Sequence, residues 1–327
     1  MNGFEQLEKV EKRHLHFKED KMRTILKIQM KIIEAARGYL KKQEFTELLP
    51  PVLSSATDPG LRGAEHATVD FYGKTYKLMG SMLLHKQMAL TSMDKIFAVS
   101  PNVRLEDPVT KDTGRHLAEF WQLDLEAANK SYEQIMGLGE GMVVYVIKEI
   151  NESCSKELGE LGRKLKVPSK PFEKITHDKA IRKLKEMGFR LEEGEEIPWE
   201  AEKALSAEYE EPFWIINYPD GSRGFYDKFD EESGDKLRDF DLIYPEGYGE
   251  AISGGEREHT KEGITRQMRK IGEDPEDYGW YLEMLEEGVP PSAGFGIGIE
   301  RLTRFICGLE TVWRASPFCK VPGVYSP

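Results

Sequence analysis

Apolar residues between positions 18 and 43 recur at spacings of three, four and seven, which puts them on one face of a helix. They are Met22, Ile25, Leu26, Ile33, Ala36 and Leu40. The paired Pro50 and Pro51 then end any helix and favour an extended edge or irregular strand. Farther on, alternation over 68–78 predicts a strand, and we expect a helix from Ser81, a residue suited to the N-cap position.

The stretch 100–126 has the pattern of two strands joined by a polar loop. Strand alternation puts Arg104 and Glu106 on one face, and Phe120, Gln122 and Asp124 on one face of the returning segment. The loop 107–117 contains a proline, a glycine and an adjacent arginine and histidine, which suits a loop that folds over an anionic ligand. Periodicity alone leaves open a solvated hairpin with cross-strand ion pairs.

Residues 129–210 have the pattern of a helical insertion, in which Ser131 and Gln134 have the spacing of a capping box. We interpret the glycines at 137, 139 and 141 as sites of close helix packing, because no strand precedes them. We expect no chemistry in this insertion. Strand patterns return at 212–218 and 239–253, and a glycine-rich strand leads into a helix over 290–309.

Two acidic residues interrupt the β-prone stretch 239–253. Asp241 and Glu250 lie among apolar residues, where a carboxylate needs a partner, and the pattern alone is satisfied by lysines at a sheet edge. The glycines at 294, 296 and 298 do not form a dinucleotide-binding fingerprint, because no βαβ unit with a following acidic residue surrounds them.

Composition narrows the class of protein. The chain has 327 residues, 39% hydrophobic and 32% charged, which is enough for a large buried core. Its net charge of −12 argues against an extensive exposed surface for nucleic acid. The three cysteines lack C-x-x-C spacing, and no apolar run approaches membrane-spanning length. We therefore expect no membrane partner and a cytoplasmic location.

The segments VRLED and TGRHLAEF resemble the second signature of class II aminoacyl-tRNA synthetases, in the version of the aspartyl and asparaginyl enzymes. The resemblance implies an α+β fold with a mostly antiparallel sheet flanked by helices, and one catalytic domain over 1–327 with the helical insertion at about 129–210. It also implies the ATP-binding residues: Arg104 at the α-phosphate, Glu106 at the adenine amino group, His116 at the β- and γ-phosphates, and Phe120 under the adenine ring.

Other segments resemble further parts of the same family. The helix and proline-rich strand near the N-terminus are similar to the first signature, which implies a homodimer. The segment 290–309 resembles the third signature, which implies that Arg301 covers the adenine and contacts the γ-phosphate. The resemblance implies Mg²⁺ at Asp241 and Glu250, and a substrate carboxylate at Arg257.

The amino-acid subsite matches the family only in part. Ser81, Lys86 and Gln87 agree with the segment that binds the amino acid, whereas Leu83 replaces its second glutamine. The resemblance implies that Ser81 and Lys86 bind substrate, that Asp124 orients the substrate ammonium, and that Gln122 assists. Amino-acid recognition is therefore expected to be altered in detail.

The catalytic pattern begins within the first few dozen residues, which leaves no room for an N-terminal anticodon-binding domain. The combination is similar to the archaeal asparagine synthetase-like relatives of asparaginyl-tRNA synthetase. That resemblance implies an AMP-forming aspartate–ammonia ligase, which makes asparagine from aspartate, ATP and ammonia through an aspartyl-adenylate. Arg104 and Arg301 are its expected catalytic residues, Mg²⁺ its cofactor, and tRNA is not an expected partner.

Three alternatives stay open at this point. The first is a minimal aspartyl- or asparaginyl-tRNA synthetase, and the second is a ligase that joins aspartate to another amine. The third is a non-catalytic sensor of amino acids or nucleotides. The complete set of ATP-activation residues argues against a sensor, which has little need for all of them.

Overall fold

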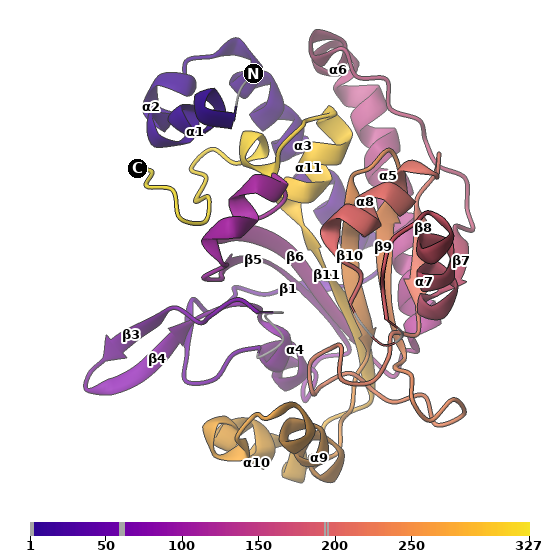
Figure 1. Ribbon diagram of the computed structural model, residues 1–327. Coiled ribbons are helices and arrows are strands. Elements are labelled where there is room, and N and C mark those ends of the chain that lie inside the picture. The colour runs from indigo at the N-terminus through magenta and orange to yellow at the C-terminus, as the bar shows by residue number, and fades with distance from the viewer. Residues whose placement is uncertain (1–2, 59–62, 193, 195) are drawn as a thin grey trace.

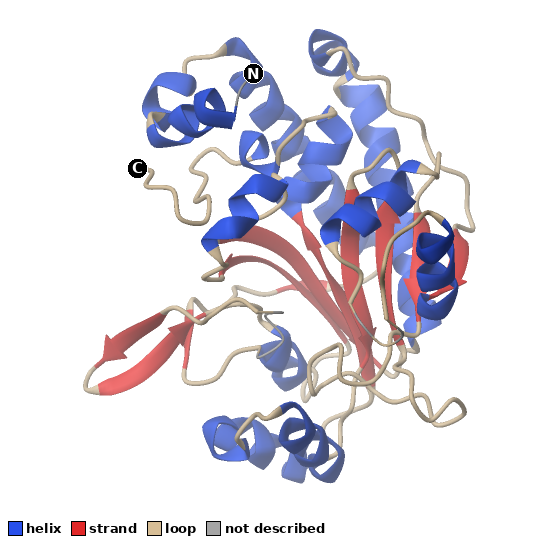
Figure 2. Ribbon diagram, in the orientation of Figure 1, coloured by secondary structure: helices blue, strands red, loops and turns tan. Residues whose placement is uncertain are grey.

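The computed structural model describes residues 3–58, 63–192, 194 and 196–327, and a large twisted sheet runs through its centre (Figures 1 and 2). Within those residues the sheet has eight strands in the order β1-β5-β6-β11-β10-β9-β8-β7. Neighbouring strands are antiparallel except for the pairs β1–β5 and β7–β8. The strands are β1 (Thr46–Glu47), β5 (Lys95–Val103), β6 (Glu119–Ala128), β7 (Glu173–Thr176), β8 (Phe213–Ile216), β9 (Asp239–Tyr244), β10 (Gly249–Glu256) and β11 (Ser292–Gly298).

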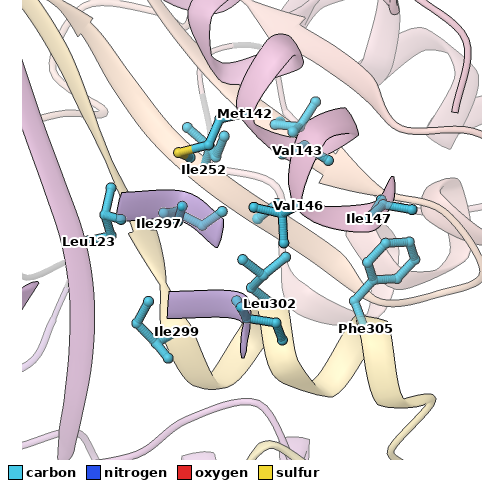
Figure 3. Packing of buried hydrophobic residues seen from close by; sticks show 14 of the residues in the cluster. Leu123, Met142, Val143, Val146, Ile147, Ile252, Ile297, Ile299, Leu302 and Phe305 are labelled. Atoms are coloured by element: carbon cyan, nitrogen blue, oxygen red, sulfur yellow. The ribbon is translucent and has the colours of Figure 1, made fainter. Parts of the chain in front are cut away.

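Three helices cover one face of this sheet and form the main core with it. They are α3 (Asp20–Lys42), α5 (Tyr132–Ser153) and α11 (Ile299–Cys307). Figure 3 shows Ile252 and Ile297 of the sheet meeting Met142 and Val146 of α5. The capping box predicted at Ser131 and Gln134 is formed at the start of α5. The fold class predicted above, a mostly antiparallel sheet with flanking helices, is confirmed.

A small second sheet projects from the main body, with the strand order β2-β4-β3 (Figure 1). Its strands are β2 (Leu53–Ser54), β3 (Thr68–Phe71) and β4 (Lys74–Leu78). The single strand predicted over 68–78 is wrong, because the chain turns back at Tyr72 and Gly73, both with positive φ. The following helix, α4 (Leu83–Ala89), begins later than predicted, and the Ser81 hydroxyl accepts a hydrogen bond from the Leu83 amide at 3.2 Å.

The segment 129–210 contains a strand as well as helices. After α5 come α6 (Ser155–Leu161), β7, α7 (His177–Glu186) and α8 (Trp199–Ala207). Close packing is found at Gly139, where a Cβ would lie 3.3 Å from the Trp214 ring, and at Gly141, where it would overlap with the Tyr39 hydroxyl, but a Cβ at Gly137 would meet nothing within 4 Å. Strand β7 extends the main sheet beyond β8, so this segment is built into the central architecture.

The remaining elements are helices at the ends of the chain and in the segments between strands. They are α1 (Gly3–Glu11), α2 (Arg13–His16), α9 (Lys261–Ile271), α10 (Gly279–Glu287), and the 3₁₀ helices Pro108–Thr113, Pro275–Tyr278 and Val312–Ala315. Among the described residues, no helix is long and apolar enough to cross a membrane. The homodimer stays a prediction, and exposed apolar side chains occur on α3 and in the segment after it, at Met30, Leu49 and Val52.

Candidate functional site

The face of the sheet opposite the three core helices carries the polar residues. On β6, Leu123 and Leu125 enter the core, whereas Phe120, Gln122 and Asp124 line a cavity of about 780 Å³. Every site residue predicted from the sequence lines this cavity. They are Ser81, Lys86, Arg104, Glu106, His116, Phe120, Gln122, Asp124, Asp241, Glu250, Arg257 and Arg301.

Arg104 and Phe120 lie together at one side of the cavity. The Arg104 guanidinium carbon is 5.2 Å from the centre of the Phe120 ring, and Arg104 Nε donates to the Gly80 carbonyl oxygen at 3.1 Å. Strand β5 ends at Val103, so Arg104 and Glu106 lie just beyond it and not within a strand as expected. Burial raises the pKa of Glu106, although the nearby Arg104 opposes that shift.

His116 lies in the same loop and is neutral at physiological pH. Burial, together with the neighbouring Arg301 and Arg115, lowers its pKa to about 3. Its Nδ1 lies 2.9 Å from the Thr113 hydroxyl oxygen, which fixes the ring. In the ligand-free protein this residue therefore offers a phosphate a neutral N–H donor and not a charge.

Glu250, which lines the cavity, bridges two arginines. Its carboxylate lies 3.0 Å from Arg301 Nη1 and 3.0 Å from Arg115 Nη2. The register of β10 against β9 shifts between Glu250 and Ile252, an irregularity that redirects side chains on the bulged strand. Arg115 also pairs with Glu202 of α8 at 2.9 Å. The predicted metal ligand Glu250 is therefore held by cations in this structure.

A second group of charges is buried deeper, around Lys86 of α4. Lys86 Nζ lies 2.9 Å from Asp124 Oδ1 and 3.2 Å from Glu126 Oε2. On the far side of Glu126 is Arg257, whose Nε and Nη1 lie 3.1 Å from Glu126 Oε1 and 2.7 Å from Asp227 Oδ1. We call these five residues the deep charge cluster. Its two cations are matched against three carboxylates.

A glycine on β11 makes the deep charge cluster possible. A Cβ at Gly294 would overlap with the Glu126 carboxylate and with the Leu125 carbonyl oxygen. Gly294 pairs with Glu126 in the β11–β6 register, and its carbonyl oxygen accepts from Arg257 Nη2 at 2.9 Å. The glycine-rich strand noted in the sequence therefore gives room for buried charge.

Asp241, the other predicted metal ligand, is paired with Arg223. The Arg223 guanidinium lies 2.7 Å from Asp241 Oδ2 and 3.2 Å from Asp239 Oδ2, and it stacks 3.7 Å above the Tyr218 ring. Burial raises the pKa of Asp239 well above its ordinary value. Among the described residues, no three His, Cys, Asp or Glu side chains are grouped to hold a metal ion by themselves.

Several cavity residues were missed by sequence reasoning. Glu202 and Trp199 come from the insertion in which no chemistry was expected, yet both line the cavity. The others include Asp58, Glu196, Tyr218, Arg223, Tyr226, Asp227, Asp239 and Glu300. Of these residues, Asp239 could have been noticed in the sequence, because it is a second aspartate in the same β-prone stretch as Asp241.

Glu300, in the first turn of α11, is expected to make stability depend on pH. It accepts hydrogen bonds from the Trp121 amide at 3.1 and 3.3 Å, and burial raises its pKa from 4.5 to about 7. The folded state thus binds the proton more tightly than the unfolded state, so stability is full below pH 4.5 and falls as pH rises through about 7.

The unmodified protein is therefore expected to lose stability between pH 5 and pH 8. In Glu300→Gln this decrease in the free energy of unfolding is expected to be smaller by about 1–3 kcal/mol. Thermal and urea unfolding at both pH values measure it, with the exposed Glu287→Gln as the control. An unchanged difference between the two pH values in Glu300→Gln would contradict this assignment.

Comparison with known proteins identifies the family to which this cavity belongs. Residues 5–322 match the family described as tRNA synthetases class II (D, K and N). The asparagine–tRNA ligases of Pyrococcus abyssi and Thermococcus kodakarensis are 34% and 35% identical, over 96% of this chain and 72% and 73% of theirs. The solved asparaginyl-tRNA synthetase from Pyrococcus horikoshii, in complex with asparaginyl-adenylate, superimposes with a TM-score of 0.90 at 32% identity. That match covers 98% of this chain and 73% of the other.

These relatives overturn two expectations. The chain was expected to be an aspartate–ammonia ligase and not to have tRNA as a partner, yet relatives along 96% of its length are named asparagine–tRNA ligases. The expectation had rested on the early start of the catalytic pattern and on the wording of short motifs, neither of which distinguishes the two reactions, whereas the similarity to asparagine–tRNA ligases extends along 96% of the chain. The chain belongs to the class II tRNA synthetase family of the aspartate, lysine and asparagine enzymes.

Proposed function

We propose that this chain is an ATP-dependent ligase that activates asparagine as asparaginyl-adenylate and transfers it to tRNA. The observation that carries the proposal is the convergence, on one cavity, of the five residues expected to bind ATP: Arg104, Glu106, His116, Phe120 and Arg301. The names of the relatives, together with the adenylate bound by the Pyrococcus horikoshii enzyme, supply the amino acid and the acceptor.

The first chemical step follows from the charges around the cavity. A carboxylate is a poor electrophile, so an amino acid must first receive a leaving group, which here is AMP. Arg104 and Arg301 lie where they can neutralise the phosphates, and the loop with His116 supplies a further N–H donor. The amino-acid carboxylate then displaces pyrophosphate in line at the α-phosphate, and positioning supplies much of the acceleration.

Mg²⁺ fits the two carboxylates proposed for it. Asp241 and Glu250 lie on neighbouring strands and both line the cavity, and magnesium typically binds through one or two carboxylates plus phosphate oxygens. When bound there, the ion would neutralise charge on the phosphates. Each of the two carboxylates also lies beside an arginine, Asp241 beside Arg223 and Glu250 beside Arg301.

The deep charge cluster favours asparagine over aspartate. Lys86 and Arg257 are already opposed by the carboxylates of Asp124, Glu126 and Asp227, so the cluster carries excess negative charge. A second substrate carboxylate would add to that excess in a buried site, whereas a carboxamide would not. In addition, Asp124 Oδ2 is buried and accepts no hydrogen bond from any described residue, so an ammonium or amide N–H of the substrate would satisfy it.

We expect asparagine to exceed aspartate by at least about 10²-fold in kcat/KM, because binding aspartate leaves an uncompensated buried charge. Amino-acid-dependent exchange of pyrophosphate into ATP measures this ratio. The variant Asp227→Asn removes one carboxylate from the deep charge cluster and so lowers its excess negative charge. It is therefore expected to reduce the preference for asparagine over aspartate in kcat/KM. Equal or better exchange with aspartate in the unmodified protein would contradict the assignment of asparagine.

A further inference from the structure

The insertion helix α8 reaches the nucleotide side of the cavity through one buried carboxylate. Glu202 is 7% exposed, and its Oε1 accepts from Arg115 Nη1 at 2.9 Å and from the Glu250 amide at 2.8 Å. Its neighbour one turn earlier, Trp199, lies under the same arginine, with the guanidinium carbon 4.7 Å from the ring centre. Arg115 is therefore held on two sides by α8.

The way α8 packs on the sheet fixes this contact. Gly249 has a φ of +74°, and a Cβ there would lie 2.5 Å from both Glu202 Oε1 and the Trp199 ring. Farther along the helix, the Ser206 hydroxyl donates to the Tyr244 carbonyl oxygen at 2.6 Å and accepts from the Gly249 amide at 3.3 Å. Any side chain at position 249 would thus push Glu202 away from the arginine.

Glu202 and Glu250 hold Arg115 in different ways. Glu250 shares its carboxylate between Arg115 and Arg301, and it faces the region where phosphates are proposed to bind. Phosphates that enter between the two arginines compete with Glu250 for both of them. Glu202 is instead anchored by the backbone of β10, through the hydrogen bond from the Glu250 amide, which a phosphate ligand would not displace.

We propose that Glu202 is a positioning residue that holds Arg115 at the nucleotide site, so that the insertion 129–210 takes part in binding the ATP phosphates. The proposal rests on the function proposed above, because it assumes that phosphates occupy this side of the cavity. Arg115 Nη1 serves the anchor to α8, and Nη2, now bound to Glu250, becomes the donor to phosphate. Without the anchor, the guanidinium would follow Glu250 or turn to solvent.

The test compares Glu202→Gln with Glu200→Gln, an exposed residue of the same helix. Glu202→Gln keeps an acceptor for the Glu250 amide but loses the charge that holds the arginine. We expect it to weaken binding of a non-hydrolysable ATP analogue about tenfold in calorimetry. The rate of pyrophosphate exchange at saturating ATP and the affinity for asparagine are expected to stay within about twofold. Glu200→Gln should match the unmodified protein in every respect.

Two further variants, Arg115→Ala and the double variant Glu202→Gln/Arg115→Ala, test whether Glu202 acts through Arg115. If Glu202 acts through Arg115, the double variant binds the analogue no more weakly than Arg115→Ala alone. Additive losses, or unchanged binding in Glu202→Gln, would overturn the proposal. If Glu202→Gln does not fold, Glu202→Asp carries the test, since it keeps the charge but shortens the reach; wild-type affinity in that variant overturns the proposal as well.

The failure of this proposal can be distinguished from failure of the proposed function. Analogue binding is measured without catalysis, so it judges Glu202 even if the protein shows no amino-acid-dependent exchange. Absence of exchange with normal analogue binding would reject the proposed ligase. Loss of the predicted coupling with normal exchange would reject the role of Glu202 alone.

Discussion

Replacing Arg104 with alanine is expected to slow adenylate formation by about 10²- to 10³-fold, equivalent to about 3–4 kcal/mol of transition-state stabilisation. The side chain lies at the cavity wall between the Phe120 ring and the Gly80 carbonyl oxygen. In the proposed function it would offer charge and a planar fork where negative charge develops on the α-phosphate. Pyrophosphate exchange at saturating asparagine measures the loss.

The fold is expected to survive this change, because Arg104 is only partly buried. Arg266→Ala, at an exposed arginine of α9, removes the same side chain away from the cavity and serves as the control. An Arg104→Ala protein with exchange within about threefold of normal would show that Arg104 does not contact the reacting phosphate.

The second large effect is expected on stability, from Lys86→Met. The side chain is 1% exposed and pairs with Asp124 and Glu126. Methionine keeps much of the volume but removes one of the two cations that the deep charge cluster sets against its three buried carboxylates. Because removal of one partner leaves uncompensated buried charge, we expect the free energy of unfolding at neutral pH to fall by about 3–5 kcal/mol. Urea unfolding measures it.

The matched control is Lys156→Met, at a lysine that is 84% exposed and makes a surface pair with Glu160. Such pairs contribute little, so the control is expected to change stability by less than about 1 kcal/mol. If Lys86→Met were as stable as the control, the deep charge cluster would not carry the charges assigned to it, and the preference for asparagine argued from those charges would lose its basis.

Local pattern predicted much of the architecture because the relevant signals lie close together in the chain. The apolar spacing over 18–43 marks α3, and the capping box at Ser131 marks the start of α5. The failure over 68–78 has a local cause. Tyr72 adopts a positive φ, which is uncommon for an aromatic residue and is not expected from the sequence. The alternation of apolar and polar residues therefore ran on through a turn that only Gly73 indicates.

The candidate site was predicted in its residues but not in its pairings. The resemblance selected the residues that line the cavity, yet it gave Lys86 the role of a substrate ligand with no hint that Asp124 and Glu126 enclose it. Those partners are distant in sequence. Glu202 was missed for a related reason. A glutamate on a helix with several charged residues is expected to be solvent-exposed, and nothing near it in the sequence shows that Gly249, by lacking a side chain, lets the helix pack closely on the sheet.

The measurement that tests the central claim most directly is transfer of radiolabelled asparagine to tRNA by the pure protein with ATP and Mg²⁺. We predict that label becomes attached to tRNA, that AMP forms in equal amount, and that aspartate does not replace asparagine. Formation of free asparagine and AMP from aspartate and ammonium, with no label on tRNA, would contradict the proposed function.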